Sequence, residues 1–187
     1  IHMRFTDNHD ERRAVARFGE PAALAASLLM FTLDGVPMLY NGMEVGDTAE
    51  SGAPALFERL PIFWPIAERR PEFPRFYKQM TALRKSSEAL RRGDLQWLRN
   101  SDEARVVTFV RRAGGEEILV AINFSNQPFA GFVEGGGAGF ADVTPDTQPP
   151  LAPDATPAQR AARARTVGLP AIALDSWGYR IFRRLTR

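Results

Sequence analysis

The chain has 187 residues, of which 44% are hydrophobic and 25% charged, and its formal net charge is +2 at pH 7. These values are typical of globular domains, so they exclude a chain that is disordered or membrane-embedded throughout and predict one or two packed domains. The absence of cysteine excludes disulfides and thiolate metal sites, and it leaves the cellular compartment open.

The first part of the chain alternates between strand-like and helix-like segments. Residues 4–10 begin as an extended segment and end in a polar cluster, which is typical of a strand that opens into a loop. Residues 21–33 favour a helix, with a proline in the first turn and too many apolar residues for an exposed position. Residues 36–40 form a short apolar run between turn signals, which indicates a strand buried on both faces.

A second helix and a series of short strands follow. Residues 75–92 carry apolar side chains at helical spacing, and Gly93 stands where a C-terminal cap belongs. Beyond it the chain is rich in β-branched and aromatic residues, and Gly114-Gly115 marks a hairpin. Residues 143–168 are rich in proline, alanine and arginine, which predicts a mobile loop between strands. Strands are predicted within residues 95–99, 104–112, 116–124, 129–134 and 179–185.

The order of these elements predicts an α/β segment that is joined to an all-β segment near residue 93. We therefore expect two domains, residues 1–92 and residues 93–187, the second of them an antiparallel β-sandwich. Two parallel strands with two helices leave open sheet edges, and a helix as apolar as 21–33 needs more neighbours than the first domain supplies. The first domain is thus expected to be part of something larger.

Two segments about 25 residues apart carry recognisable motifs. The first is the tripeptide Asn-His-Asp at 8–10, preceded by Phe5, and the second is GVPMLYNGMEVG at 35–46. A lone Asn-His-Asp is common in turns and helix caps. Both motifs together, in this order, resemble the ends of strands seven and eight in the α-amylase superfamily of glycoside hydrolases. Three further segments are similar to the same family: residues 56–64, 76–85 and 174–182.

The resemblance implies a fold and a chemistry. The fold is α/β plus all-β: a partial (β/α)8 barrel, made of strands seven and eight with their helices, followed by an antiparallel β-sandwich. The chemistry is retaining cleavage or transfer of α-glucosidic bonds, in which one carboxyl group attacks the anomeric carbon and a second protonates the leaving oxygen. By the motif, Asp10 is a third carboxylate that stabilises the transition state, and His9 donates a hydrogen bond to the same sugar.

Neighbours of this pair receive weaker interpretations. Arg13 follows Asp10 by three residues and is a candidate for substrate binding, although a structural salt bridge explains it equally well. Glu44 is interpreted as architectural and Asn8 as a turn former. The candidate catalytic residues are Asp10 and His9, and the candidate substrate-binding residues are Asp10, His9 and Arg13.

Other parts of the family's machinery have no counterpart in the sequence. The nucleophile, in a Gly-x-Arg-x-Asp setting on strand four, and the acid on strand five lie upstream of strand seven, and no segment here matches them. We expect no metal and no cofactor in this chain, whereas the resemblance allows calcium in the parent protein. The chain is therefore expected to be an inactive fragment of a parent glycoside hydrolase or transglycosylase that acts on α-glucans.

Several partners and one alternative function remain open. The expected partners are an α-glucan or oligosaccharide, bound through the parent protein, and either the missing barrel portion or a second copy that covers the open sheet edges. We expect no nucleic-acid partner, because 22 acidic residues are interleaved with the 24 basic ones. The absence of a long apolar run argues against a membrane partner.

The alternative function is that of a noncatalytic carbohydrate-binding or structural β-sandwich module. Trp97 and Trp177 are its binding candidates, although core packing is the commoner fate of tryptophans in strands.

Overall fold

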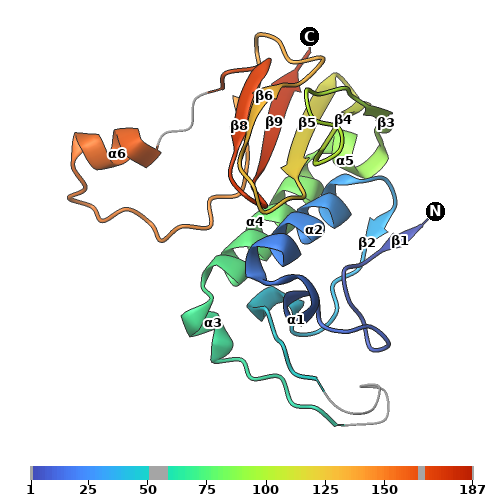
Figure 1. The fold of residues 1–187 in the computed structure, drawn as a ribbon, viewed down its shortest axis with the longest axis vertical. Helices are drawn as coiled ribbons and strands as arrows, with labels where there is room; N and C mark the ends of the chain where they lie inside the picture. The colour runs from blue at the N-terminus through green and yellow to red at the C-terminus, as the bar shows by residue number, and fades with distance from the viewer. Residues whose placement is uncertain (1, 51–58, 164–166, 187) are drawn as a thin grey trace.

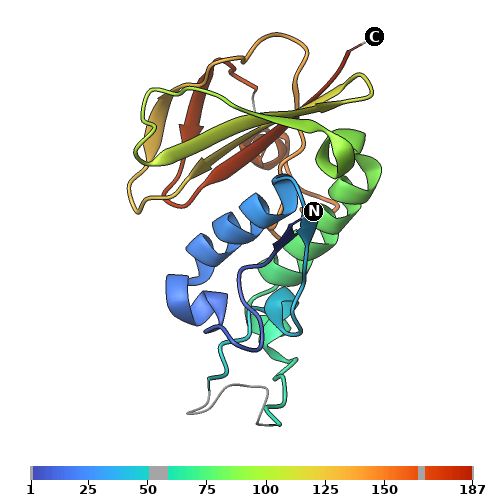
Figure 2. The ribbon, with the colours of Figure 1, turned by 90° about the vertical axis from the view of Figure 1, so that its right-hand side faces the viewer.

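The computed structural model describes residues 2–50, 59–163 and 167–186. The N-terminal part contains β1 (Met3–Arg4), α1 (Ala14–Phe18), α2 (Glu20–Thr32), β2 (Val36–Pro37), the 3-10 helix η1 (Met43–Val45), α3 (Ile66–Arg69), α4 (Glu72–Ser86) and α5 (Glu88–Arg92). The C-terminal part contains β3 (Asp94–Trp97), β4 (Val106–Ala113), β5 (Glu116–Asn123), β6 (Phe129–Phe132), β7 (Ala141–Asp142), α6 (Pro157–Arg163), β8 (Ala171–Leu174) and β9 (Tyr179–Leu185). Helices α1 to α4 lie below the strands of the C-terminal part in Figures 1 and 2, whereas α6 lies to the left of the strands in Figure 1. None of the described helices is long and apolar enough to cross a membrane.

The first two strands pair in parallel, as the sequence predicts. Met3 is opposite Val36 and Arg4 is opposite Pro37. The pairing is shorter than the predicted strands, because β1 and β2 contain only two residues each. The pair forms a two-stranded sheet, which leaves both outer edges of this sheet unpaired among the described residues.

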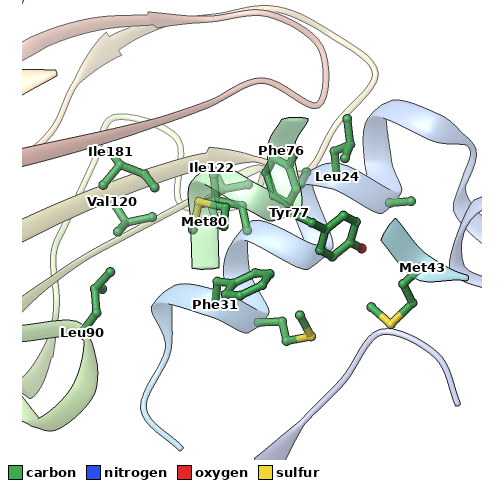
Figure 3. Close-up of a cluster of buried hydrophobic side chains, with 14 of the residues drawn as sticks. Leu24, Phe31, Met43, Phe76, Tyr77, Met80, Leu90, Val120, Ile122 and Ile181 are labelled. Atoms are coloured by element: carbon green, nitrogen blue, oxygen red, sulfur yellow. The ribbon is translucent and has the colours of Figure 1, made fainter. Parts of the chain in front are cut away.

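Helix α2 is buried as its composition predicts, with Pro21 in its first turn and nine of its 13 residues buried. It packs with α4 against one face of the large sheet (Figure 2). Figure 3 shows this core, in which side chains from helices and strands meet: Leu24, Phe31, Met43, Phe76, Tyr77, Met80, Leu90, Val120, Ile122 and Ile181. One hydrophobic core therefore extends across residue 93, and the helices and the sheet bury each other's apolar faces.

The single helix predicted for 75–92 is wrong, because the chain breaks at Ser87. Ser87 has extended backbone angles, and its hydroxyl accepts from the Leu90 amide and donates to Glu116 at 2.9 Å. Glu116 also accepts from the Ala89 amide at 2.9 Å. This carboxylate therefore caps the first turn of α5, where the amide would otherwise bond back to a carbonyl oxygen of α4. Gly93 is not a left-handed cap, but a Cβ there would lie 2.4 Å from the carbonyl oxygen of Ala89.

The C-terminal strands form two antiparallel sheets. The larger has the order β3-β4-β5-β9-β7, and β6 pairs with β8 in the smaller one. The hairpin between β4 and β5 turns at Gly114 and Gly115, both with positive φ, as predicted. Between the sheets lies a second core, to which β5 contributes Leu119, β9 contributes Phe182 and the small sheet contributes Phe129 and Leu174. The large sheet is thus covered by helices on one face and by β6 and β8 on the other.

The prediction of a loop over residues 143–168 is wrong for α6, which spans seven of them. Its start is a capping box: the Thr156 amide donates to the Gln159 side chain at 2.8 Å, and the Gln159 amide donates to the Thr156 hydroxyl at 3.2 Å. Residues 164–166 lie outside the described residues, as do residues 56–58 of the segment that resembles the family.

The two tryptophans of the C-terminal part differ in exposure. Trp97 was expected in the core, but it is 60% exposed because β3 is an edge strand, and its ring contacts Phe109 edge-on at 5.4 Å. Trp177 is half-buried, with φ of 55° in the turn before β9.

Candidate functional site

The segment between β1 and α1 folds into a tight loop that presents the Asn-His-Asp tripeptide. The side-chain oxygen of Asn8 accepts from the Asp10 amide at 2.8 Å and from the Glu11 amide at 3.0 Å. Asn8 is therefore a turn former, as predicted, because these bonds mimic a backbone turn. The turn holds the backbone of Asp10 and leaves the side chains of His9 and Asp10 exposed.

His9 and Asp10 are the solvent-accessible members of the site. Their side chains are 46% and 65% exposed, and Nε2 of His9 lies 3.2 Å from Oδ2 of Asp10. The His9 ring is also 6.5 Å from the ring of Tyr40, which stands in the segment after β2. The loops that follow the two parallel strands therefore meet at one end of the pair, as the βα loops of a parallel barrel do.

Arg13 lies behind this pair in a buried ion cluster. The residue is 8% exposed, and its Nη2 donates to the carbonyl oxygen of Asn41 at 2.6 Å and to Oδ2 of Asp47 at 2.9 Å. Its Nη1 lies 3.7 Å from Oδ1 of Asp7, and the guanidinium carbon is 5.0 Å from the centre of the Tyr40 ring. The guanidinium thus contacts protein groups on both sides, whereas its predicted contact with substrate stays a prediction.

Asp7 joins the ion cluster to the start of α1. Its Oδ2 accepts from the Ala14 amide at 2.7 Å, whereas its Oδ1 has no hydrogen-bond partner among the described residues. Burial raises the pKa of Asp7, against the Ala14 hydrogen bond and the charge of Arg13, and the nearby Asp47 raises the pKa further. Asp7 is therefore a buried carboxylate of the ion cluster, with little of its surface open to solvent.

The loop after β2 is shaped to admit the arginine. Gly42 has φ of 91°, and a Cβ there would lie 2.4 Å from Nη2 of Arg13. Glu44 accepts from the Gly42 amide at 3.0 Å, which supports its interpretation as architectural. Sequence reasoning passed over four members of this site: Asp7, Tyr40, Gly42 and Asp47. The available signal was the segment GMEVGD, whose two glycines, each followed within two residues by an acidic residue, indicate a turn with close approach.

No metal-binding arrangement is present among the described residues. No group of three or more histidine, aspartate or glutamate side chains in residues 2–50, 59–163 and 167–186 could hold an ion. Asp7 and Asp47 share the charge of Arg13, so they do not form an oxygen cage for calcium.

Replacing Asp7 with asparagine should alter how stability depends on pH. Because its folded-state pKa is raised, the folded chain binds more protons than the unfolded one, and stability is lost as pH rises from about 3.9 through the folded-state pKa. Asp7→Asn removes this loss but retains an acceptor for the Ala14 amide. In urea unfolding between pH 4 and 7, the free energy of unfolding of Asp7→Asn should therefore rise relative to that of the natural chain as the pH rises. The opposite trend would mean that attraction to Arg13 outweighs burial in its effect on the pKa of Asp7.

Known proteins resemble this chain over part of their length. No protein-family model matches it. A cyclomaltodextrinase of Geobacillus thermopakistaniensis is 31% identical over 122 residues, which cover 64% of this chain and 20% of the relative. Alpha-amylase 2 of Dictyoglomus thermophilum is 32% identical over 131 residues, 66% of this chain and 22% of the relative. The chain thus spans about a fifth of the length of the curated relatives that it matches.

Solved structures show the same fold. The trehalose-6-phosphate hydrolase of Bacillus licheniformis superposes with a TM-score of 0.68 at 17% identity, over 98% of this chain and 43% of that one. Isomaltulose synthase of Klebsiella gives a TM-score of 0.68 at 22% identity, over 97% and 42%. With the two motifs side by side in space and these curated relatives matched over about a fifth of their length, the chain corresponds to a C-terminal portion of an α-amylase-superfamily glycosidase.

Proposed function

We propose that this chain supplies the transition-state-stabilising carboxylate of a retaining glycoside hydrolase or transglycosylase that acts on α-glucans. Asp10 holds hydroxyl groups of the sugar at the cleaved bond, and His9 donates a hydrogen bond to the same sugar. The observation that carries the proposal is the exposed His9–Asp10 pair, which lies beside Tyr40 where the loops after both parallel strands meet.

Three aspartates lie in the two loops, and their surroundings distinguish them. Asp7 and Asp47 are buried against Arg13, so contact with a sugar would require the ion cluster to open. Asp10 is exposed and is held at its backbone by Asn8, which leaves its side chain available. A carboxylate that binds an oxocarbenium-like ring more tightly than the ground state lowers the barrier, so Asp10 is the member suited to this role.

The same proposal extends to the fold. We assign β1 and β2 to strands seven and eight of a (β/α)8 barrel, and residues 93–187 to a C-terminal β-sandwich domain. Parallel pairing of β1 with β2 supports the first assignment, and the two antiparallel sheets around a second core support the other. In a barrel of this kind the loops after the strands converge on the active site, which is where His9 and Asp10 stand.

The remaining chemical groups are proposed to come from outside this chain. Retaining cleavage needs a nucleophile and an acid about 5–5.5 Å apart, and no segment of this sequence matches the family's motif for either. Asp10 stabilises charge at the sugar only when other groups attack the anomeric carbon and protonate the leaving oxygen. The parent protein is therefore the enzyme, and this chain alone is inactive.

The purified chain should not hydrolyse starch, maltooligosaccharides or an activated α-glucoside. Loss of one member of a cooperative catalytic set removes most of the rate acceleration, and here two members are missing. The assay compares the chain at high concentration with the complete protein in which it occurs, which should be active. Turnover by the chain alone that Asp10→Ala abolishes would mean that another carboxylate, such as Glu11, Glu44 or Asp47, acts in its place.

Open edges suggest the partner of the N-terminal strands. Met3, Phe5, Val36 and Leu39 are all exposed on or beside the two-stranded sheet. Exposed apolar groups at an unpaired edge favour association, so we propose that the missing barrel strands or a second copy of the chain cover them. The alternative of a carbohydrate-binding module has less support, because the exposed Trp97 ring already packs edge-on against Phe109.

A further inference from the structure

We propose that Arg13 is a positioning residue: it locks the loop that carries His9 and Asp10 to the loop after β2, and so fixes where the exposed pair stands. The arginine lock consists of Asp7, Arg13, Asn41 and Asp47. Its relevance to catalysis rests on the proposed function, whereas the lock itself is a property of this chain.

The lock joins residues that are distant in the sequence. Asp7 and Arg13 bracket the His9–Asp10 loop, and Asn41 and Asp47 bracket the loop around η1. The bonds to Asn41 and Asp47 span 28 and 34 residues along the chain. In this region, a single buried guanidinium therefore ties both loops together, and its loss would leave two buried carboxylates without their shared cation.

Tyr40 connects the lock to the exposed pair. Its ring has the Arg13 guanidinium 5.0 Å from its centre and the His9 ring at 6.5 Å. A cation–π contact at this distance favours one position of the Tyr40 ring, and the His9 ring lies beside that ring. A shift of Arg13 should therefore move His9, and with it Asp10, whose carboxylate is 3.2 Å from the imidazole.

The geometry of the lock requires an arginine, and another cationic side chain such as lysine does not fit it. The guanidinium directs Nη2 to two acceptors and Nη1 towards Asp7, while its plane lies by Tyr40. A lysine ammonium is a single point charge that cannot span these acceptors in the same way. Gly42 leaves no room for rearrangement on one side, since even a Cβ there would collide with Nη2.

The test compares Arg13→Lys with Arg12→Lys in this chain. Arg12 is the matched control, because it is the adjacent arginine, is exposed and pairs only with Glu50 among the described residues. NMR resonances of the Asp10 amide and of the His9 and Tyr40 rings should shift and broaden in Arg13→Lys and stay unchanged in Arg12→Lys. A folded Arg13→Lys chain with all three sets of resonances unmoved would overturn the proposal.

A second variant decides the matter where Arg13→Lys fails to fold. Asp47→Asn weakens one bond of the lock and retains an oxygen acceptor, and it should move the same three sets of resonances by smaller amounts. In the complete enzyme, Arg13→Lys should lower kcat on the order of 100-fold with KM little changed, because a displaced catalytic group acts in the transition state. Unchanged resonances in Asp47→Asn, or an unchanged kcat, would refute the lock. Full activity of an Asp10→Asn enzyme would instead refute the proposed function and leave the NMR result standing.

Discussion

Asp10→Asn should lower the turnover of the complete enzyme on the order of 1,000-fold or more and leave its fold intact. The carboxylate is 65% exposed, so its contribution to the core is small. The Asn8 turn uses the Asp10 amide rather than its side chain, so the loop survives the substitution. The amide of asparagine lacks the negative charge that an oxocarbenium-like ring requires. Steady-state kinetics with a maltooligosaccharide and thermal unfolding measure the two effects separately.

Glu11→Gln provides the control for this result. Glu11 is the next residue, its side chain is also about half exposed, and it lies 3.6 Å from Arg17 on α1. The same change of charge at this position should leave turnover nearly unchanged, because the motif gives Glu11 no role. A loss of only a few-fold in Asp10→Asn, or equal losses in both variants, would show that Asp10 is structural and that the motif match misleads.

The sequence predicted the elements that follow from local patterns. Helix α2 was predictable because its proline and its run of apolar residues act within one segment, and the β4–β5 hairpin because two adjacent glycines determine its turn. The break at Ser87 was not predictable, because it depends on Glu116, which is 29 residues away. Local pattern therefore predicts an element more reliably than its ends, which tertiary contacts shift.

The same distinction applies to the site. Asp10 and His9 were found because they are adjacent in a motif. The arginine lock was missed because its members are separated by up to 34 residues in the bond to Asp47, and each taken alone is a common loop residue. Trp97 was misplaced for a related reason: strand composition does not reveal which strand lies at the edge of the sheet.

Arg111→Met should lower the free energy of unfolding by about 2–4 kcal/mol, because it removes a cap that the sheet places on helix α2. Arg111 is 2% exposed, and it donates to the carbonyl oxygens of Thr32 and Gly93, each at 2.8 Å. Burial lowers the pKa of Arg111, so holding the charge there has a cost that the hydrogen bonds offset. Methionine fills much of the space but leaves two carbonyl oxygens without this donor, one of them at the negative end of a helix.

Arg112→Met is the matched control for this effect, since the same substitution is made at the next residue of β4. The Arg112 side chain is 44% exposed and pairs with Glu117 at 2.8 Å, so its loss should cost less than about 1 kcal/mol. Urea unfolding of both variants measures the difference, and equal losses of the free energy of unfolding would contradict the cap.

The loss of the cap on α2 should also affect the site, because α2 leads directly into β2 and the Tyr40 segment. Arg111→Met should therefore also broaden the NMR resonances of Tyr40 and His9, whereas Arg112→Met should not.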